Sequence, residues 1–168
     1  MTIAELFSGK AAAVACLLLG LGGCATPPAR DGVAPFYRPL DRAGAAVDTA
    51  AAAEVFSAYR RNHGLGALRF DAGLTGEAAA SATSAARADK PASADALKQR
   101  LAAKGVRAPG VNLSAGYRTL AEAFSGWRES PQHNRVLLQQ SATRFGIATA
   151  YAPGSKYKVY WALVVAGD

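Results

Sequence analysis

Residues 125–138 hold most of the side chains that could do chemistry in this chain. The pair Ser130 and Pro131 predicts the start of a helix, because a serine hydroxyl can cap the first turn and proline is tolerated at the first helical position. His133 would then lie in that first turn, where the helix dipole disfavours imidazolium and keeps the ring neutral. A neutral ring can bind a metal, accept a proton or accept a hydrogen bond. Taken alone, the segment favours a histidine that satisfies a local polar group.

Acid–base catalysis needs a second titratable group placed against the first. Near His133 the sequence offers Glu129 and Glu122 as candidates. Ser114 is a weak candidate nucleophile for a Ser–His pair, because the residues around it form no nucleophile elbow. The sequence thus leaves open a hydrolase that uses His133, with Glu129 as the candidate partner.

The beginning of the chain predicts a lipoprotein signal peptide over residues 1–23. Lys10 precedes an apolar run at residues 11–19, a length that fits a signal-peptide core and is too short to span a bilayer. Residues 21–24 read Leu-Gly-Gly-Cys and resemble the bacterial lipobox, whose cysteine is lipidated and becomes the mature N-terminus. We therefore expect acyl chains, palmitate among them, on Cys24. An ordinary secretory signal with an incidental cysteine is the alternative.

The charge and cysteine content agree with an exported protein. The formal net charge is +7, and it stays +7 without residues 1–23 because Lys10 and Glu5 leave together. Cys16 would be removed and Cys24 would carry lipid, so no disulfide is expected. The basic residues are scattered, a pattern that favours a solvated basic surface, with attraction to anionic lipid or to an anionic envelope polymer as the alternative. No nucleic-acid recognition motif is present, so nucleic acid is not an expected partner.

Residues 24–47 are rich in Pro and Gly and predict a tether, followed by one domain over residues 48–168. The capping and periodicity signals predict helices over residues 48–63, 74–87, 93–104 and from 119 past 127, with residues 65–70 as a connector. Two strands, 144–151 and 157–165, are expected to close the chain. Trp127 and Trp161 lie on apolar faces and should be buried.

The second of these strands is apolar on both faces, so both faces should be covered by other elements. This pattern predicts an α+β domain with helices first and a sheet last. The architecture should be a three-layer α-β-α sandwich of about four helices around a small, mainly antiparallel sheet.

Five sequence blocks, in order and spacing, resemble the CAP (SCP/PR-1-like) superfamily over residues 50–168. In bacterial members these blocks read approximately R-x-x-x-G-L-x-x-L, G-E-N-L-A-x-G, W-x-x-S-P-x-H, x-x-G-I-G and Y-W. Here they fall at residues 59–74, 110–117, 127–133, 145–148 and 160–161. The resemblance implies the α-β-α sandwich that the residues also predict.

The resemblance implies a cleft that in relatives holds a divalent metal with two histidines and acidic residues. His133 matches the second histidine and Asn112 is retained, but Val111 stands in place of the glutamate. The first histidine is expected within residues 88–93, where the chain has Asp89 and Lys90 instead. Zinc normally takes at least three protein ligands. We therefore expect no metal and no cofactor.

Without a metal shell, we expect the cleft to serve binding through three residues, His133, Asn112 and Ser130. His63 does not replace the missing histidine, because it matches the end of the first family helix, away from the cleft.

The family is mostly associated with binding, and only rarely with proteolysis. We therefore expect a lipid-anchored envelope protein that acts as a binding or structural module and is not an enzyme. The residue after Cys24 is Ala25 and not an acidic residue. This resembles lipoproteins that are sorted to the outer membrane, where the domain would face the periplasm. The alternatives are a peptidase-like envelope hydrolase around His133 and a receptor for a small hydrophobic ligand held between helices.

Overall fold

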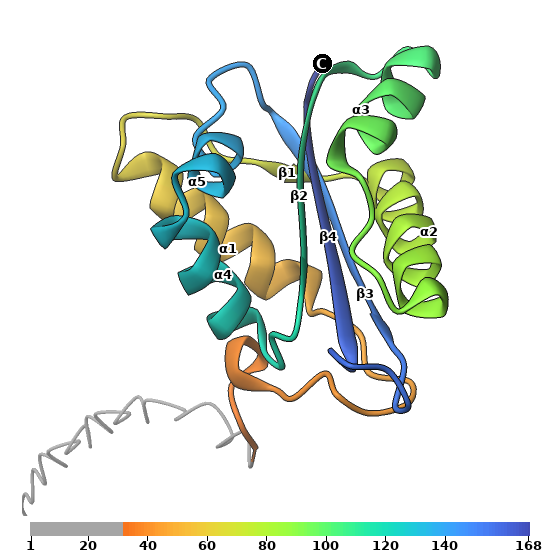
Figure 1. Cartoon of the computed structure of the whole chain (residues 1–168). Coiled ribbons are helices and arrows are strands. Elements are labelled where there is room, and N and C mark those ends of the chain that lie inside the picture. The colour runs from red at the N-terminus through yellow and green to blue at the C-terminus, as the bar shows by residue number, and fades with distance from the viewer. Residues whose placement is uncertain (1–31) are drawn as a thin grey trace, which may run out of the picture. The chain divides into compact units, whose positions relative to one another are not determined.

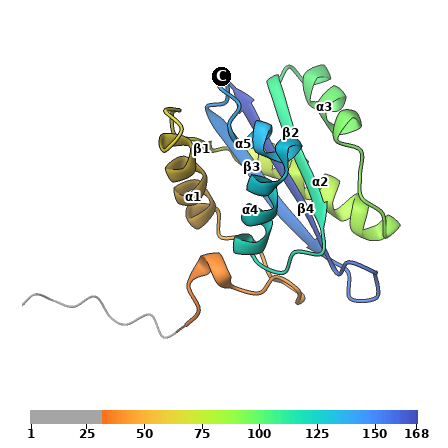
Figure 2. The ribbon, with the colours of Figure 1, turned by 60° about the vertical axis from the view of Figure 1, so that its left-hand side comes forward.

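A four-stranded mixed sheet separates two groups of helices in the computed structural model, which describes residues 32–168 (Figures 1 and 2). The strand order is β1-β3-β4-β2. Strand β1 (Arg69–Phe70) is parallel to β3 (Arg144–Tyr151), whereas β4 (Val159–Gly167) is antiparallel to both β3 and β2 (Arg107–Ala115). The predicted α-β-α sandwich with a mainly antiparallel sheet is confirmed.

The helices divide between the two faces of the sheet. Helices α1 (Thr49–Arg61), α4 (Leu120–Glu129) and α5 (Pro131–Leu137) cover one face, and α2 (Ala72–Ala88) and α3 (Ala94–Ala103) cover the other (Figures 1 and 2). Residues 32–168 thus form five α-helices where about four were expected. The fifth is α5, whose start the Ser130–Pro131 pair predicted, and the extended backbone of Ser130 separates it from α4.

Strand β4 carries the centre of both cores. Val159, Trp161, Leu163 and Val165 pack under α1 and α4, whereas Ala162, Val164 and Ala166 pack under α2 and α3. The prediction that this strand is covered on both faces is therefore confirmed. Trp127 and Trp161 are fully buried, as expected, and their rings meet edge to face at 6.0 Å.

The expected order of helices first and sheet last is wrong. Strand β2 lies between α3 and α4, and the short β1 lies inside the segment expected to be a connector. Pro109 and Gly110 conceal β2 in the sequence, because they read as a turn but form an irregularity in the pairing with β4. The last strand begins at Val159 and not at residue 157, because Lys158 has a left-handed φ of 62°.

Two of the predicted helix caps are present and a third is not. Asp48 accepts a hydrogen bond from Ala51 N at the start of α1, and Thr119 accepts one from Glu122 N at the start of α4. Ser130 is the N-cap residue of α5, but its hydroxyl makes no capping hydrogen bond. Only its backbone carbonyl accepts a bond in that turn, so the expectation of a hydroxyl cap is corrected.

The segment expected to be a tether packs against the domain from residue 32 onward. It forms a 3-10 turn at Pro35–Tyr37, and Leu40 is only 5% exposed within the core. Phe36 lies edge-on against Phe124, and Leu40 N donates to Arg118 O at 2.7 Å. The compact unit therefore begins at Gly32, because apolar side chains between the prolines find partners on the domain. Cys24 and the predicted signal peptide lie outside the described residues.

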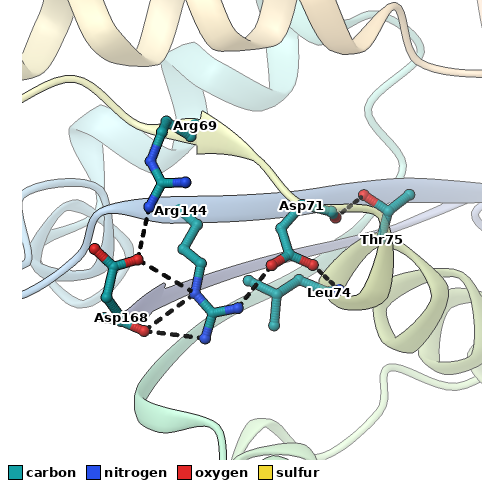
Figure 3. Close-up of polar contacts among 7 residues, drawn as sticks. Arg69, Asp71, Leu74, Thr75, Arg144 and Asp168 are labelled. Carbon is teal, nitrogen blue, oxygen red and sulfur yellow. Dashed lines mark hydrogen bonds and ion pairs between the residues drawn. The ribbon is translucent and has the colours of Figure 1, made fainter.

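An ion-pair network closes the end of the sheet near β1 (Figure 3). The carboxylate of Asp71 caps α2 through Leu74 N at 2.8 Å and binds Arg144 Nη1 at 2.7 Å. Asp168 binds Arg69 at 2.7 Å on the other side of Arg144. These contacts fix the start of α2 to the start of β3. Within residues 32–168, no helix has the length and apolar character needed to cross a bilayer.

Candidate functional site

A cavity of about 530 Å³ lies along β2, which is an edge strand of the sheet. Its walls come from the start of α3 on one side and from α5 on the other. The polar and charged residues that line it include Asp95, Lys98, Asn112, His133, Arg135 and Gln139. The cavity thus contains two of the three residues expected to form a cleft, His133 and Asn112. The third, Ser130, is half-buried and is not part of this lining.

Asn112 joins the sheet to the first turn of α5. Its side chain is fully buried, and Nδ2 donates a hydrogen bond of 3.0 Å to the backbone carbonyl of His133. Its Oδ1 is buried without a partner among residues 32–168. A buried carbonyl oxygen normally has a hydrogen-bond donor, so Oδ1 is an unsatisfied acceptor beneath the surface of the cavity and is not exposed to it.

The His133 ring is half-buried, and this burial lowers the pKa of its imidazole. The neutral ring is therefore favoured at physiological pH, in the direction expected from the sequence, and burial is the cause that the structure adds. No hydrogen bond from the ring to another of the described residues is present. The backbone carbonyl of His133, and not its ring, holds this corner through Asn112.

The charged side chains of the cavity are predominantly basic. Lys98 pairs with Asp95 at 3.5 Å, a pair one helical turn apart on α3. Arg135, on α5, makes no ion pair with another of the described residues and is exposed. Two cations and one carboxylate give the cavity a net positive charge. This balance favours an anionic group over a cation.

The expected catalytic partners do not meet His133. Glu129 is exposed and does not line the cavity, and Glu122 accepts a hydrogen bond from Arg118 N at 2.6 Å. The hydroxyl of Ser114 accepts a bond from Trp127 Nε1 at 3.1 Å. Within the part of the chain that the structure describes, none of the three forms a hydrogen bond with His133. A serine nucleophile is activated through such a hydrogen bond to its base, and Ser114 has none to His133.

The side chains at the cavity also do not suit a zinc ion of the kind that the family resemblance implies. Residues 32–168 contain no group of three His, Cys, Asp or Glu side chains close enough to hold a metal. Asp89, near the place of the expected first histidine, does not line the cavity and accepts hydrogen bonds from Tyr160 and from Lys156 N. The cations Lys98 and Arg135 would in addition repel a divalent ion.

Arg60 positions the far end of α5, a role that the sequence analysis did not identify. Its guanidinium is buried and donates to four backbone carbonyls at 2.8 to 3.0 Å, those of Gly66, Leu137, Gln139 and Ala142. Arg60 begins the first of the five sequence blocks, which was the available signal. By holding the carbonyl of Gln139, it fixes a residue that lines the cavity.

The protein is an α-β-α sandwich domain with a cleft along the edge strand β2. The model of the cysteine-rich secretory protein (CAP) family matches residues 53–165, and the chain belongs to this family. A comparison with curated proteins gave no match.

Solved structures share the fold at low sequence identity. An extracellular protein with an SCP domain from Bacillus anthracis aligns with a TM-score of 0.57 at 20% identity, covering 69% of this chain and 39% of that one. A cysteine-rich secretory protein from Staphylococcus aureus gives 0.58 at 18%, covering 71% and 38%. An outer surface protein from Borrelia burgdorferi gives 0.61 at 14%, covering 71% and 92%. The chain thus spans about two fifths of the length of the first two.

Proposed function

We propose that this protein is a lipid-anchored envelope protein whose CAP domain binds an anionic envelope polymer in the cleft along β2. The observation that carries the proposal is the composition of the cleft. It presents the half-buried His133 ring, which makes no hydrogen bond to another described residue, beside the exposed cation Arg135. These groups suit recognition of a ligand, whereas the described residues offer no group of three metal ligands and no hydrogen-bonded nucleophile for the His133 ring.

The charge of the cleft supports an anionic ligand. Lys98 and Arg135 outnumber the one carboxylate, Asp95, and His133 is neutral and can accept or donate one hydrogen bond. Carboxylate and phosphate groups are the anions of bacterial envelope polymers, and arginine binds both through two parallel hydrogen bonds. The largely polar lining argues against a receptor for a small hydrophobic molecule.

The cleft is tested by sedimentation with an insoluble anionic envelope polymer. The full chain should pellet with the polymer, and Arg135→Gln should weaken binding about tenfold, because a hydrogen bond to a charged group contributes about 1.5–3 kcal/mol. The matched control is Arg61→Gln, which removes an exposed arginine from the end of α1, outside the cleft lining. Equal binding by wild type, Arg135→Gln and Arg61→Gln would contradict the cleft as the binding site.

The alternative function is an envelope hydrolase that uses His133. Assay of the purified chain against envelope polymers separates the two functions. A hydrolase would release soluble fragments and lose this activity on His133→Ala. A binding module would release none in either form.

The anchor is supported by the lipobox-like residues 21–24 and by structural relatives described as extracellular and outer surface proteins. In a cell with two membranes, Ala25 favours the outer membrane, with the domain facing the periplasm. Cys24→Ser should release the protein from membranes or leave its signal peptide uncleaved. A variant that still carries acyl chains and fractionates with membranes would contradict the proposal.

A further inference from the structure

One end of the domain is formed by three segments that are far apart in the sequence. Residues 33–42 run across this end beside the loop between β3 and β4, as Figures 1 and 2 show below the sheet. The turn at residues 116–118 joins them, because Leu40 N donates to Arg118 O. A cavity of about 330 Å³ there is lined by Asp41, Arg118, Lys156, Tyr157 and Lys158 among others. Residues 33–42, 116–118 and 156–158 are called the basic end face below.

The basic end face carries four cations that make no ion pair within residues 32–168. They are Arg38, Arg42, Lys156 and Lys158, and all four side chains are exposed.

The carboxylates at or beside this end have other partners. Asp41 binds Arg118 at 2.7 Å, Glu122 accepts from Arg118 N, and Asp89 accepts from Lys156 N. The four cations therefore make no ion pair among the described residues, although Asp89 partly offsets the charge of Lys156.

Exposed apolar side chains accompany these cations. Val33 is 57% exposed and Tyr37 is 59% exposed, and they are two of the three large hydrophobic residues exposed in the described part of the chain. Lys156 Nζ lies 5.2 Å from the centre of the Tyr157 ring. Tyrosines with an apolar body and a polar tip, next to lysines and arginines, are typical of surfaces that sit at the interface of a bilayer.

We propose that the basic end face rests on the surface of an anionic phospholipid bilayer. Four free cations match the negative potential of such a surface, and Val33 and Tyr37 match the boundary between headgroups and acyl chains. A polymer that bound by charge alone would gain nothing from these two exposed apolar groups. The observations therefore favour a bilayer over a soluble polyanion.

The short distance in sequence from Cys24 to the basic end face agrees with this orientation, which rests on the proposed lipid anchor at Cys24. Gly32, the first described residue, lies at this end and is eight residues from Cys24 (32 − 24). Eight residues span at most about 30 Å when fully extended. An acyl anchor at Cys24 would therefore hold the basic end face nearer to the bilayer than the rest of the domain.

In that orientation the cleft, which runs along the edge strand β2, would lie on the side of the domain and not at its membrane end. The cleft is lined by residues 109–113 of β2. The part of the basic end face that follows β2 in the sequence, residues 116–118, lies beyond the C-terminal end of that strand. The basic end face would thus orient the domain and leave the cleft open to a ligand above the bilayer.

Amide hydrogen exchange on vesicles tests the proposal. The chain purified from the envelope is reconstituted with vesicles of phosphatidylcholine alone or of phosphatidylcholine with phosphatidylglycerol. Residues 33–42 and 155–158 should exchange several-fold more slowly on the anionic vesicles, whereas residues 62–66 at the opposite end should not change. Lys156→Gln with Lys158→Gln should lower the contact equilibrium roughly twentyfold, since each basic residue adds about fivefold.

The matched control is Arg61→Gln with Arg107→Gln, which removes two exposed arginines from the opposite end. This pair should keep the protection seen on anionic vesicles. Equal exchange on both vesicles, or equal loss of protection in both double variants, would overturn the proposal. The same protection by a soluble polyanion without vesicles would also overturn it, in favour of a polymer site.

Flotation of the same samples reports separately on the anchor. A wild-type chain that fails to float with phosphatidylcholine vesicles would contradict lipidation at Cys24. The effect of phosphatidylglycerol on the basic end face would still be read from the exchange data.

Discussion

The Nδ2 atom of Asn112 in β2 donates a hydrogen bond of 3.0 Å to the backbone carbonyl of His133 in α5. We expect Asn112→Ala to lower the free energy of unfolding by about 1–3 kcal/mol, because the carbonyl loses its partner in a buried site. Urea denaturation measures the change. Asn62→Ala, at the exposed end of α1, should change stability by less than about 0.5 kcal/mol. Equal effects from the two variants would show that the Asn112 bond does not stabilise the cleft.

Arg60→Lys should destabilise the protein although it keeps the positive charge. The guanidinium of Arg60 donates to four backbone carbonyls, and a lysine ammonium has three donors in a different geometry. The loss should be about 2–4 kcal/mol, since buried carbonyls are left without donors. Thermal unfolding measures it, with Arg61→Lys on the exposed side of the same helix as the control. A wild-type melting temperature for Arg60→Lys would contradict this role.

Trp127→Ala should lower the free energy of unfolding by about 3–5 kcal/mol, the usual cost of deleting a large buried aromatic side chain. Trp127 is fully buried between Phe56 and Trp161 and also donates to Ser114 Oγ. Phe70→Ala is the comparison, because Phe70 is 48% exposed and its removal should cost much less. Chemical denaturation should rank the two variants in this order, and the reverse order would refute the packing described.

The carboxylate of Asp71 should contribute stability that is lost in acid. The hydrogen bond from Leu74 N lowers the pKa of Asp71 most, and Arg144 lowers it further. A carboxyl whose pKa is lower in the folded state stabilises above its unfolded value, about 3.9, and this contribution disappears as pH falls through the folded value. Asp71→Asn keeps a capping side chain and removes the charge.

The difference in unfolding free energy between wild type and Asp71→Asn should therefore be largest at neutral pH and shrink below about pH 4. Denaturation at several pH values measures this difference. Asp95→Asn serves as the control. The Asp95 side chain is 85% exposed, and its ion pair with Lys98, at 3.5 Å, is longer than the 2.7 Å pair between Asp71 and Arg144. A difference for Asp71→Asn that does not depend on pH would show that the ion pair with Arg144 adds no stability.

Zinc should bind the purified chain only weakly or not at all. The family resemblance puts Val111 at the position of an acidic ligand, and the cleft offers His133 and Asp95 beside two cations. Groups outside the first coordination shell cannot replace missing ligands. Titration calorimetry measures binding, and His133→Ala is the control. A one-to-one site of micromolar affinity that disappears in His133→Ala would contradict this prediction and favour a metal-dependent activity.

The sequence by itself determined the layers and most helices of this domain. The starts of α1 and α4 could be read from Asp48 and Thr119, because a capping side chain acts within one turn of its own residue. Strand β4 could be read as covered on both faces, because its alternate residues are all apolar. The family blocks fixed His133 and Asn112 as neighbours in one cleft. These features depend on local chemistry or on a repeating pattern.

Only the tertiary structure decided the features that depend on distant partners. Strand β2 is a strand because it pairs with β4, about fifty residues later, despite Pro109 and Gly110 in its own sequence. Leu40 belongs to the core because its backbone N–H donates to Arg118 O and its side chain lies in the same core cluster as Phe124. Arg60 is buried because carbonyls from two distant segments, Gly66 and residues 137–142, converge on it. Such contacts have no local signature, since each residue is satisfied only when the whole chain has folded around it.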